Sequence, residues 1–210
     1  PVHYALGRGV NRSANVNSAS GKSDFATSLE QLTEELPAAA GVSLVVSWFG
    51  NDLRCGRCDI RPMVEQSVNE GVGMPWRVSD LTRTTAQVMP QLEGRSVYGG
   101  APTDQSVVEA IKAIKLAGKE VTFYPFILMT QLAVNTLPDP WSGAAGQPAL
   151  PWRGRITLDA APGMAGTADR TATATTEVAS FFGNASAAHF TRAGEVVSYS
   201  GPDQWRYRRF

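Results

Sequence analysis

Residues 42–62 read VSLVVSWFGNDLRCGRCDIRP, and this stretch decides the fold class. Residues 42–49 are mostly apolar and rich in β-branched side chains, which predicts a β-strand. Because the apolar residues follow one another almost without alternation, we expect burial on both faces, as in a parallel sheet. The run then breaks into Gly50, Asn51 and Asp52, so the strand places polar groups at its carboxyl end.

A helix and a second strand complete this pattern. Residues 103–118 begin with the capping pair Thr103-Asp104, carry apolar residues at helical spacing and end at Gly118. Residues 120–129, EVTFYPFILM, predict a second buried strand. Strand, helix and strand in this order predict an α/β fold with a parallel pair. The insertion between the first strand and its helix is long, and within it we expect a helix over 79–88 and a short strand over 95–98.

The remainder of the chain divides into a leading segment and a body. Residues 1–22 are rich in Asn, Ser, Gly and Arg and predict a linker or extended arm, whereas 23–210 form the body. In the body we expect a helix from Ser23 to Pro37, a loop over 135–154, a short strand over 155–159, a helix over 172–182 and a hairpin over 190–200. A final helix is expected to follow 201–203 and to be cut off at Phe210. Because the chain starts at Pro1 without Met, we expect it to be a segment of a longer polypeptide.

Composition excludes several function classes. The 210 residues are 43% hydrophobic and 18% charged, which is typical of a globular protein. Lys and Arg balance Asp and Glu at 19 each, so nothing predicts electrostatic binding of nucleic acid. No apolar run approaches the roughly 20 residues that span a bilayer, and there is no signal-peptide pattern. Phosphate-binding and dinucleotide-binding motifs are absent, so no cofactor is expected.

Both cysteines lie in one motif, Cys55-Gly56-Arg57-Cys58, which allows several interpretations. A structural zinc site needs four ligands, and only His3 and His189 are available beyond this pair, so no metal is expected. A redox-active pair usually sits at a helix N-terminus after a strand, but the nearby glycine indicates a loop. A local disulfide across the loop and two reduced thiols remain as the preferred alternatives.

Five strings in the chain carry a family resemblance. They are SLVVSWFGNDLRCGRCDIRP (43–62), VYGGAPTDQSVVEAIKAIK (97–115), VTFYPFILM (121–129), NTLPDPWSGAAGQPALPWRGRIT (135–157) and GPDQWRYRRF (201–210). Together they resemble the TIM-barrel-like domain of the large tail protein of gene transfer agents and related siphovirus-like phages. That domain is often described as glycoside-hydrolase-like.

The resemblance implies a fold, a role and a location. The implied fold is a partial (β/α) TIM-like barrel with long loop insertions, of which the chain holds the first strands and which continues beyond Phe210. The implied role is structural, in a phage-like tail tip or hub that assembles with other tail proteins, contacts the host envelope and helps deliver DNA. The implied location is the virion or gene transfer agent particle, after synthesis in the bacterial cytoplasm.

The same resemblance raises an enzymatic alternative, the cleavage of a cell-envelope polysaccharide, and a third possibility, a barrel that binds sugar without cleaving it. A glycosidase needs two carboxylates, which lie at strand ends in barrels of this type. No catalytic pair is identifiable in the chain, so enzymatic activity stays open. Asp52 and Asp139 are the best-placed carboxylates, either lining a sugar cleft or, as we prefer, holding turns.

The aromatic residues also allow either a sugar-binding or a structural interpretation. Trp141 and Trp152 lie in the Pro/Gly-rich loop and are candidates for an exposed sugar-stacking platform or for anchors of that loop. Trp48 and Tyr124 lie in the predicted strands and are expected in the core.

Overall fold

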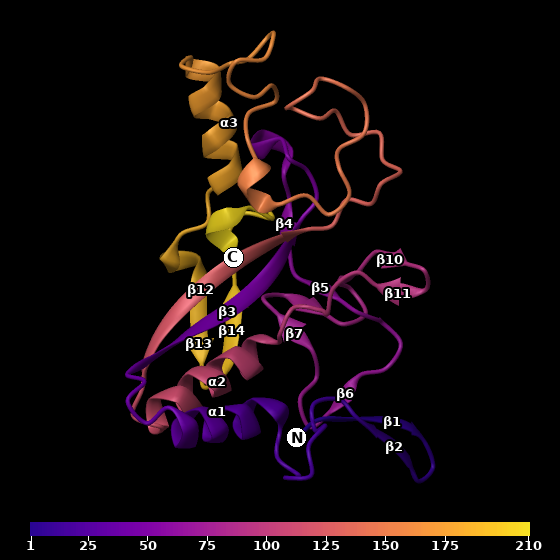
Figure 1. Ribbon diagram of the computed structural model, residues 1–210, viewed down its shortest axis with the longest axis vertical. Helices are drawn as coiled ribbons and strands as arrows, with labels where there is room; N and C mark the ends of the chain where they lie inside the picture. The colour runs from indigo at the N-terminus through magenta and orange to yellow at the C-terminus, as the bar shows by residue number, and fades with distance from the viewer.

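The computed structural model describes residues 1–210 (Figure 1). It contains three α-helices, α1 (Asp24–Glu35), α2 (Asp104–Leu116) and α3 (Ala172–Phe182). The longest strands are β3 (Gly41–Gly50) and β12 (Glu120–Met129). The shorter strands are β1 (His3–Gly7), β2 (Val10–Ser13), β4 (Ile60–Arg61), β5 (Met63–Val64), β6 (Gly71–Val72), β7 (Arg77–Val78), β8 (Leu81–Thr82), β9 (Gln87–Val88), β10 (Gln91–Leu92), β11 (Arg95–Ser96), β13 (Phe190–Ala193) and β14 (Val196–Tyr199). Four short 3₁₀ turns are η1 (Cys55–Arg57), η2 (Arg153–Arg155), η3 (Ala187–His189) and η4 (Tyr207–Arg209).

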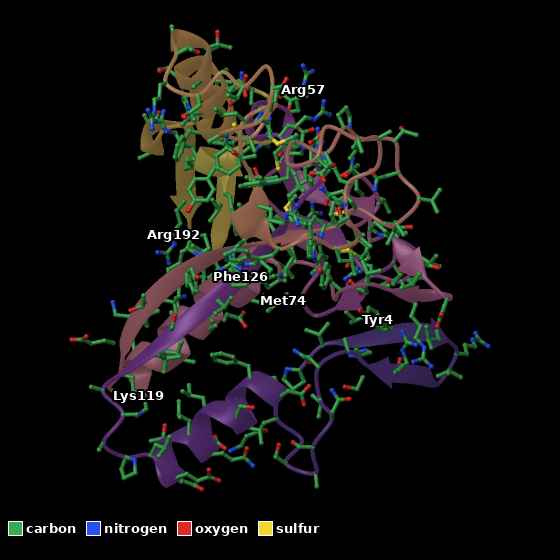
Figure 2. The ribbon with its side chains drawn as sticks, turned by 45° about the horizontal axis from the view of Figure 1, so that its top comes forward. Tyr4, Arg57, Met74, Lys119, Phe126 and Arg192 are labelled. Carbon is green, nitrogen blue, oxygen red and sulfur yellow. The ribbon has the colours of Figure 1, made fainter.

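The centre of the molecule is a long parallel ribbon made by β3 and β12. Their ten residues pair in register from Gly41 opposite Glu120 to Gly50 opposite Met129. The connection between them includes α2, which lies against both strands and buries Ala110 and Ile114. Both strands and this helix are therefore confirmed where the sequence predicts them. Lys119, labelled in Figure 2, closes the turn between α2 and β12 by donating to the Ala39 carbonyl at 2.8 Å.

The prediction of a partial TIM-like barrel, which came from the resemblance, is wrong. The fourteen strands form six small sheets of two or three strands, and none of these sheets closes into a barrel. The sheet that holds the ribbon has the order β12-β3-β4, and β4 pairs only with Phe49 and Gly50.

The backbone of β12 gives a physical reason for this open arrangement. Glu120 and Thr130 donate their N–H groups to the β3 side, to the carbonyls of Ala40 and Gly50. Because strand residues alternate in direction, the even-numbered residues face β3 and the odd-numbered ones, Pro125 among them, face the other edge. Proline has no N–H to donate, so it is confined to edge strands and interrupts pairing there.

Burial on both faces of the first strand is also not observed. The burial of β3 rises toward its carboxyl end, where Trp48 and Phe49 lie in the core. In its first half Val45 is 51% exposed, and its register partner Tyr124 is 42% exposed rather than in the core. The sheet contains only one further strand, β4, which pairs with Phe49 and Gly50 and not with this half of the ribbon.

The leading segment contains more structure than a linker. Strands β1 and β2 form an antiparallel hairpin, and β1 also pairs with β6 from the insertion. The helix predicted from Ser23 is confirmed as α1, and the Ser23 hydroxyl accepts a hydrogen bond from the Ala26 N–H. This helix contacts α2 on the side of the molecule that also holds the N-terminus (Figure 1).

The insertion over 51–102 is built from short strands and turns, so the helix expected over 79–88 is wrong. Ser79 has a left-handed φ of 55°. The Thr82 N–H donates to the Thr85 hydroxyl at 2.9 Å. Hydroxyls that capture backbone N–H groups in this way compete with helix formation. The insertion is held internally by the buried Arg83, which binds the carboxylates of Glu65 at 2.9 Å and Glu70 at 3.2 Å.

The C-terminal part confirms α3 and the β13–β14 hairpin but not a final helix. Only the 3₁₀ turn η4 follows residue 203. Arg209 is buried there, its guanidinium 3.7 Å from the Trp205 ring centroid and bonded to Asp80. Phe210 stacks on Trp48 at 4.8 Å. These side-chain contacts draw the segment into the core. Similarly, residues 155–159 make only an isolated bridge from Thr157 to Arg54 and no strand.

One main core joins the ribbon, the insertion and the C-terminal segment. Its members include Trp48, Leu53, Ile60, Trp76 and Trp205, all buried. None of the helices has the length and apolar character needed to cross a bilayer.

Candidate functional site

The candidate site lies at the carboxyl ends of β3 and β12. In open parallel sheets, ligands bind outside the carboxyl ends of the strands, so this is where a site is expected. Two loops meet here, residues 51–59 after β3 and residues 130–158 after β12. An isolated β-bridge between Arg54 and Thr157 joins the two loops. Next to it, the Cys55 N–H donates to the Thr157 carbonyl at 2.6 Å.

Asp52 is buried at this point and is fully engaged within the chain. Its carboxylate accepts hydrogen bonds from the Arg54 Nη2 at 2.6 Å, the Arg54 Nε at 3.0 Å and the Arg54 backbone N–H at 2.8 Å. A fourth bond comes from the Gln147 Nε2 at 2.7 Å. Burial alone raises the pKa of Asp52, but these hydrogen bonds outweigh it, so the pKa lies below its ordinary value. Asp52 is therefore a structural anion and a poor general acid.

Gln147 is the hub that joins the two loops, and sequence reasoning missed it. It is 2% exposed, and its Oε1 accepts from the Leu53 N–H at 2.9 Å and from the Gln131 Nε2 at 2.8 Å. Its Nε2 donates to Asp52 and to the Pro138 carbonyl. One signal was available for this network. Gln131 follows strand β12 after a single residue, much as Asp52 follows β3.

Asp139 is buried within its own turn. Its carboxylate accepts hydrogen bonds from the Trp141 N–H at 3.1 Å and the Ser142 hydroxyl at 3.0 Å. Its backbone pairs with Ala144 and Gly143. The structure brings this turn close to Asp52 because Gln147 bridges Asp52 and Pro138. Both carboxylates are nevertheless occupied by internal donors.

The two loop tryptophans are arranged differently. Trp141 is 41% exposed, and its indole Nε1–H donates to the Arg155 carbonyl at 2.7 Å, which anchors the loop. Trp152 is 68% exposed, and its ring lies over Gly154, where an added Cβ would come within 2.4 Å of it. Only Trp152 therefore presents an extensive free aromatic surface.

Cys55 and Cys58 are buried free thiols, so the disulfide allowed by the sequence is not formed. Burial raises the pKa of Cys58 to about 11, and burial together with the nearby Glu177 raises the pKa of Cys55. A raised pKa keeps a thiol protonated and unreactive, unlike a redox or catalytic cysteine. No group of three or more His, Cys, Asp or Glu side chains is arranged to hold a metal ion.

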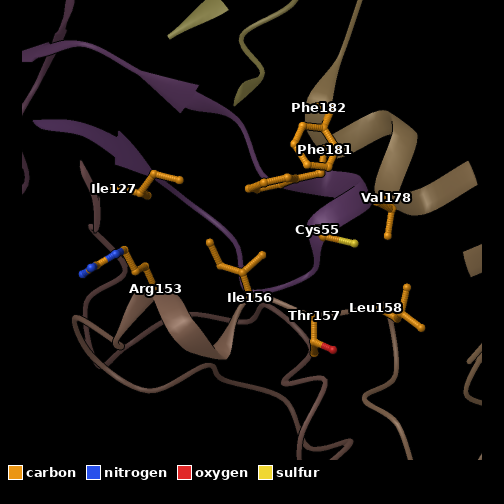
Figure 3. A pocket seen from close by; sticks show the side chains of 9 residues that line it. All are labelled: Cys55, Ile127, Arg153, Ile156, Thr157, Leu158, Val178, Phe181 and Phe182. Carbon is orange, nitrogen blue, oxygen red and sulfur yellow. The ribbon is translucent and has the colours of Figure 1, made fainter. Parts of the chain in front are cut away.

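Beside this network lies an apolar cavity of about 430 Å³ (Figure 3). It opens between α3 and the 153–158 segment, and its wall includes Cys55, Ile127, Ile156, Val178 and Phe181. Arg153 lines it too, and its guanidinium lies 3.7 Å from the centroid of the Phe126 ring, which Figure 2 labels on β12. The protonated Cys55 thiol has no base beside it in the cavity wall, so the cavity lacks an activated nucleophile.

The Asp52–Gln147 network joins the loops 51–59 and 130–158, and we call it the braced junction. Its geometry is that of a structural contact rather than of a hydrolytic centre. A glycosidase acid needs a raised pKa and a free proton-transfer path, whereas Asp52 is ion-paired and Asp139 is held by its turn. No protein-family model and no curated protein matches the sequence.

Proposed function

We propose that this chain is a structural part of a phage-like tail tip or hub protein, of the kind that gene transfer agents carry. It assembles with other tail proteins there and contributes to contact with the host envelope and to DNA delivery. The five sequence strings that resemble the tail-protein domain support this role. So does the way the candidate site uses its polar groups, because the residues that could do chemistry instead brace two loops.

The single observation that carries the proposal is the open edge of β3. The backbone groups of Ser43, Val45 and Ser47 point away from β12, and β4 reaches only Phe49 and Gly50. A strand whose edge is unpaired over residues 43–47 is a template for another strand, and proteins usually cover or blunt such edges. The other side of the ribbon is blunted by Pro125, whereas this stretch of β3 contains no proline. An edge of this kind fits a protein that is covered by its neighbours in an assembly.

The proposal is tested by placing a charge on this edge. Lys in place of Val45, which is 51% exposed, should block strand pairing by a neighbour and leave the isolated chain folded. Val134→Lys is the matched control, because Val134 is 100% exposed in a loop. We expect the yield of intact tailed particles from producing cells to fall about tenfold with Val45→Lys, equivalent to about 1.4 kcal/mol of association energy. Equal particle yields for the two variants, with equal melting temperatures of the purified chains, would refute the role of this edge.

A further inference from the structure

The apolar cavity beside α3 takes no part in the braced junction. Seven of the nine residues that line it are hydrophobic, and the two others are Arg153 and Thr157. Its volume of about 430 Å³ is within the range of about 300–1,000 Å³ that is typical of small-molecule sites. Water gains few hydrogen bonds against such a wall, so the cavity favours an apolar ligand.

Backbone contacts fix the two walls of this cavity. On one wall, the Ser180 hydroxyl of α3 donates to the Gly56 carbonyl at 3.1 Å, which ties the helix to the turn that holds Cys55. On the other wall, the Cys55 N–H donates to the Thr157 carbonyl at 2.6 Å. The cavity is thus preformed rather than a gap between loosely joined segments.

Apolar side chains also surround the mouth of the cavity. Val178 is 43% exposed and Phe182 is 37% exposed, although both line the cavity. Exposed apolar surface that continues into a cavity is typical of a binding groove. A hydrocarbon chain that enters it removes this surface and its own methylene groups from water together.

Arg153 places a positive charge at one end of the cavity. The contacts that hold its guanidinium are neutral, because it lies 3.7 Å from the centroid of the Phe126 ring and donates to the Tyr124 hydroxyl at 3.2 Å. Figure 3 shows the guanidinium turned outward, on the side away from Val178. Since the Tyr124 oxygen accepts from Arg153, its own O–H can donate to an anion bound there.

Negative charge lies beside the rest of the wall. Burial, and after it the charges of Glu177 and Asp159, raise the pKa of Cys55. Both carboxylates are engaged within the chain, because Asp159 pairs with Arg57 at 3.1 Å and Glu177 accepts the Asp159 N–H at 2.8 Å. An anionic group is therefore repelled from this end and attracted to Arg153, whereas a cationic group finds no free carboxylate.

We infer that this cavity binds a fatty acid, with the acyl chain between α3 and the 153–158 segment and the carboxylate on Arg153. The acyl chain matches the hydrophobic wall, and a carboxylate matches the planar fork of a guanidinium. A neutral apolar molecule would leave the charge of Arg153 without a partner. This inference goes beyond the proposed tail role and does not depend on it.

Calorimetric titration of the full chain near neutral pH with octanoate, decanoate and dodecanoate tests the inference. The three acids are ionised at this pH, and they are used below the concentrations at which they form micelles. We expect saturable binding, with each added pair of methylenes lowering the dissociation constant about fifteenfold until the cavity is full. Decyltrimethylammonium, which has the chain length of decanoate and a positive head, should bind at least about tenfold more weakly.

Two substitutions examine the head-group contact and the cavity separately. Arg153→Gln should weaken decanoate binding about tenfold and leave that of decyltrimethylammonium unchanged, whereas a general loosening of the cavity would weaken both. Arg95→Gln, at an exposed position of β11, is its matched control and should change neither. Val178→Trp fills the mouth and should weaken decanoate at least about tenfold, unlike Val134→Trp at a fully exposed position. Circular dichroism verifies that the variants fold.

Other occupants of the cavity would overturn the inference. If the cavity takes an apolar side chain of a partner protein, none of the three acids binds saturably. If it takes the acyl chain of a membrane lipid, the protein floats with phosphatidylglycerol vesicles while the free acids do not bind. Equal affinities for decanoate and decyltrimethylammonium, or an unchanged decanoate affinity in Arg153→Gln, would contradict the assigned carboxylate site.

Discussion

Replacing Gln147 by Ala tests the bracing role of the junction most sharply. The substitution removes the acceptor of the buried Leu53 N–H and the donor to the buried Asp52 carboxylate. An unsatisfied buried amide costs about 1–3 kcal/mol, and a lost bond to a charged group costs about 1.5–3 kcal/mol. We therefore expect the free energy of unfolding to fall by about 3–5 kcal/mol.

The assay is equilibrium unfolding in urea, followed by tryptophan fluorescence and circular dichroism. For a chain of this size, 1 kcal/mol shifts the melting temperature by about 2–4 °C, so a loss of about 3–5 kcal/mol should lower the melting temperature by about 6–20 °C. Gln87→Ala, at an exposed position, is the control and should change stability by less than about 0.5 kcal/mol. A loss below about 1 kcal/mol for Gln147→Ala would refute the reasoning, because a group left buried without its partner costs at least that much.

Three further predictions follow from the same structure. Gly183→Ala should lower the free energy of unfolding in urea by about 2–4 kcal/mol, because the strain of a left-handed backbone and the clash of the new Cβ with Arg206 add together. Gly194→Ala is the control, because Gly194 has a similar φ but lies in open space. It should cost only about 1 kcal/mol. The folded-state pKa of Asp52 is lowered, so its stabilising contribution is present above its unfolded pKa of about 3.9 and is lost as pH falls through the folded value. Unaltered protein should therefore lose more stability than Asp52→Asn on acidification from neutral pH, and parallel pH profiles would contradict this. Cys55 and Cys58 should react with a thiol reagent at pH 7 only after unfolding, and fast labelling of folded protein would show that the thiols are not protected.

The parts of the fold that follow local rules could be predicted from the sequence. The α2 helix and β12 came from apolar periodicity and from β-branched and aromatic content, and the β13–β14 hairpin came from its glycine turn. The helix expected over 79–88 failed because threonine hydroxyls bind nearby backbone N–H groups there. The final helix failed because long-range contacts of Arg209 and Phe210 decide the conformation of that segment.

The barrel expectation failed for a related reason. Strand content indicates which residues form strands, whereas the number of neighbours that each strand has depends on pairing across the whole chain. Pro125 was visible in the sequence, but its direction, away from β3, emerges only from the register.

The candidate site was predictable only in outline. Asp52 was located because it follows a predicted strand, and Asp139 because of its turn-forming neighbours. The partners that occupy these carboxylates could not be found in the same way. Gln147 lies 95 residues from Asp52 in sequence, and its role depends on the path of a loop that has no periodicity. Whether a polar group is free for chemistry or consumed by bracing is decided by such distant contacts.

Immunogold electron microscopy of purified particles, with an antibody raised against this chain, tests the central claim most directly. If the chain is a structural part of a tail tip or hub, gold should label the end of the tail on most particles. Purified tailed particles that contain none of this chain, by labelling and by mass spectrometry, would contradict the account.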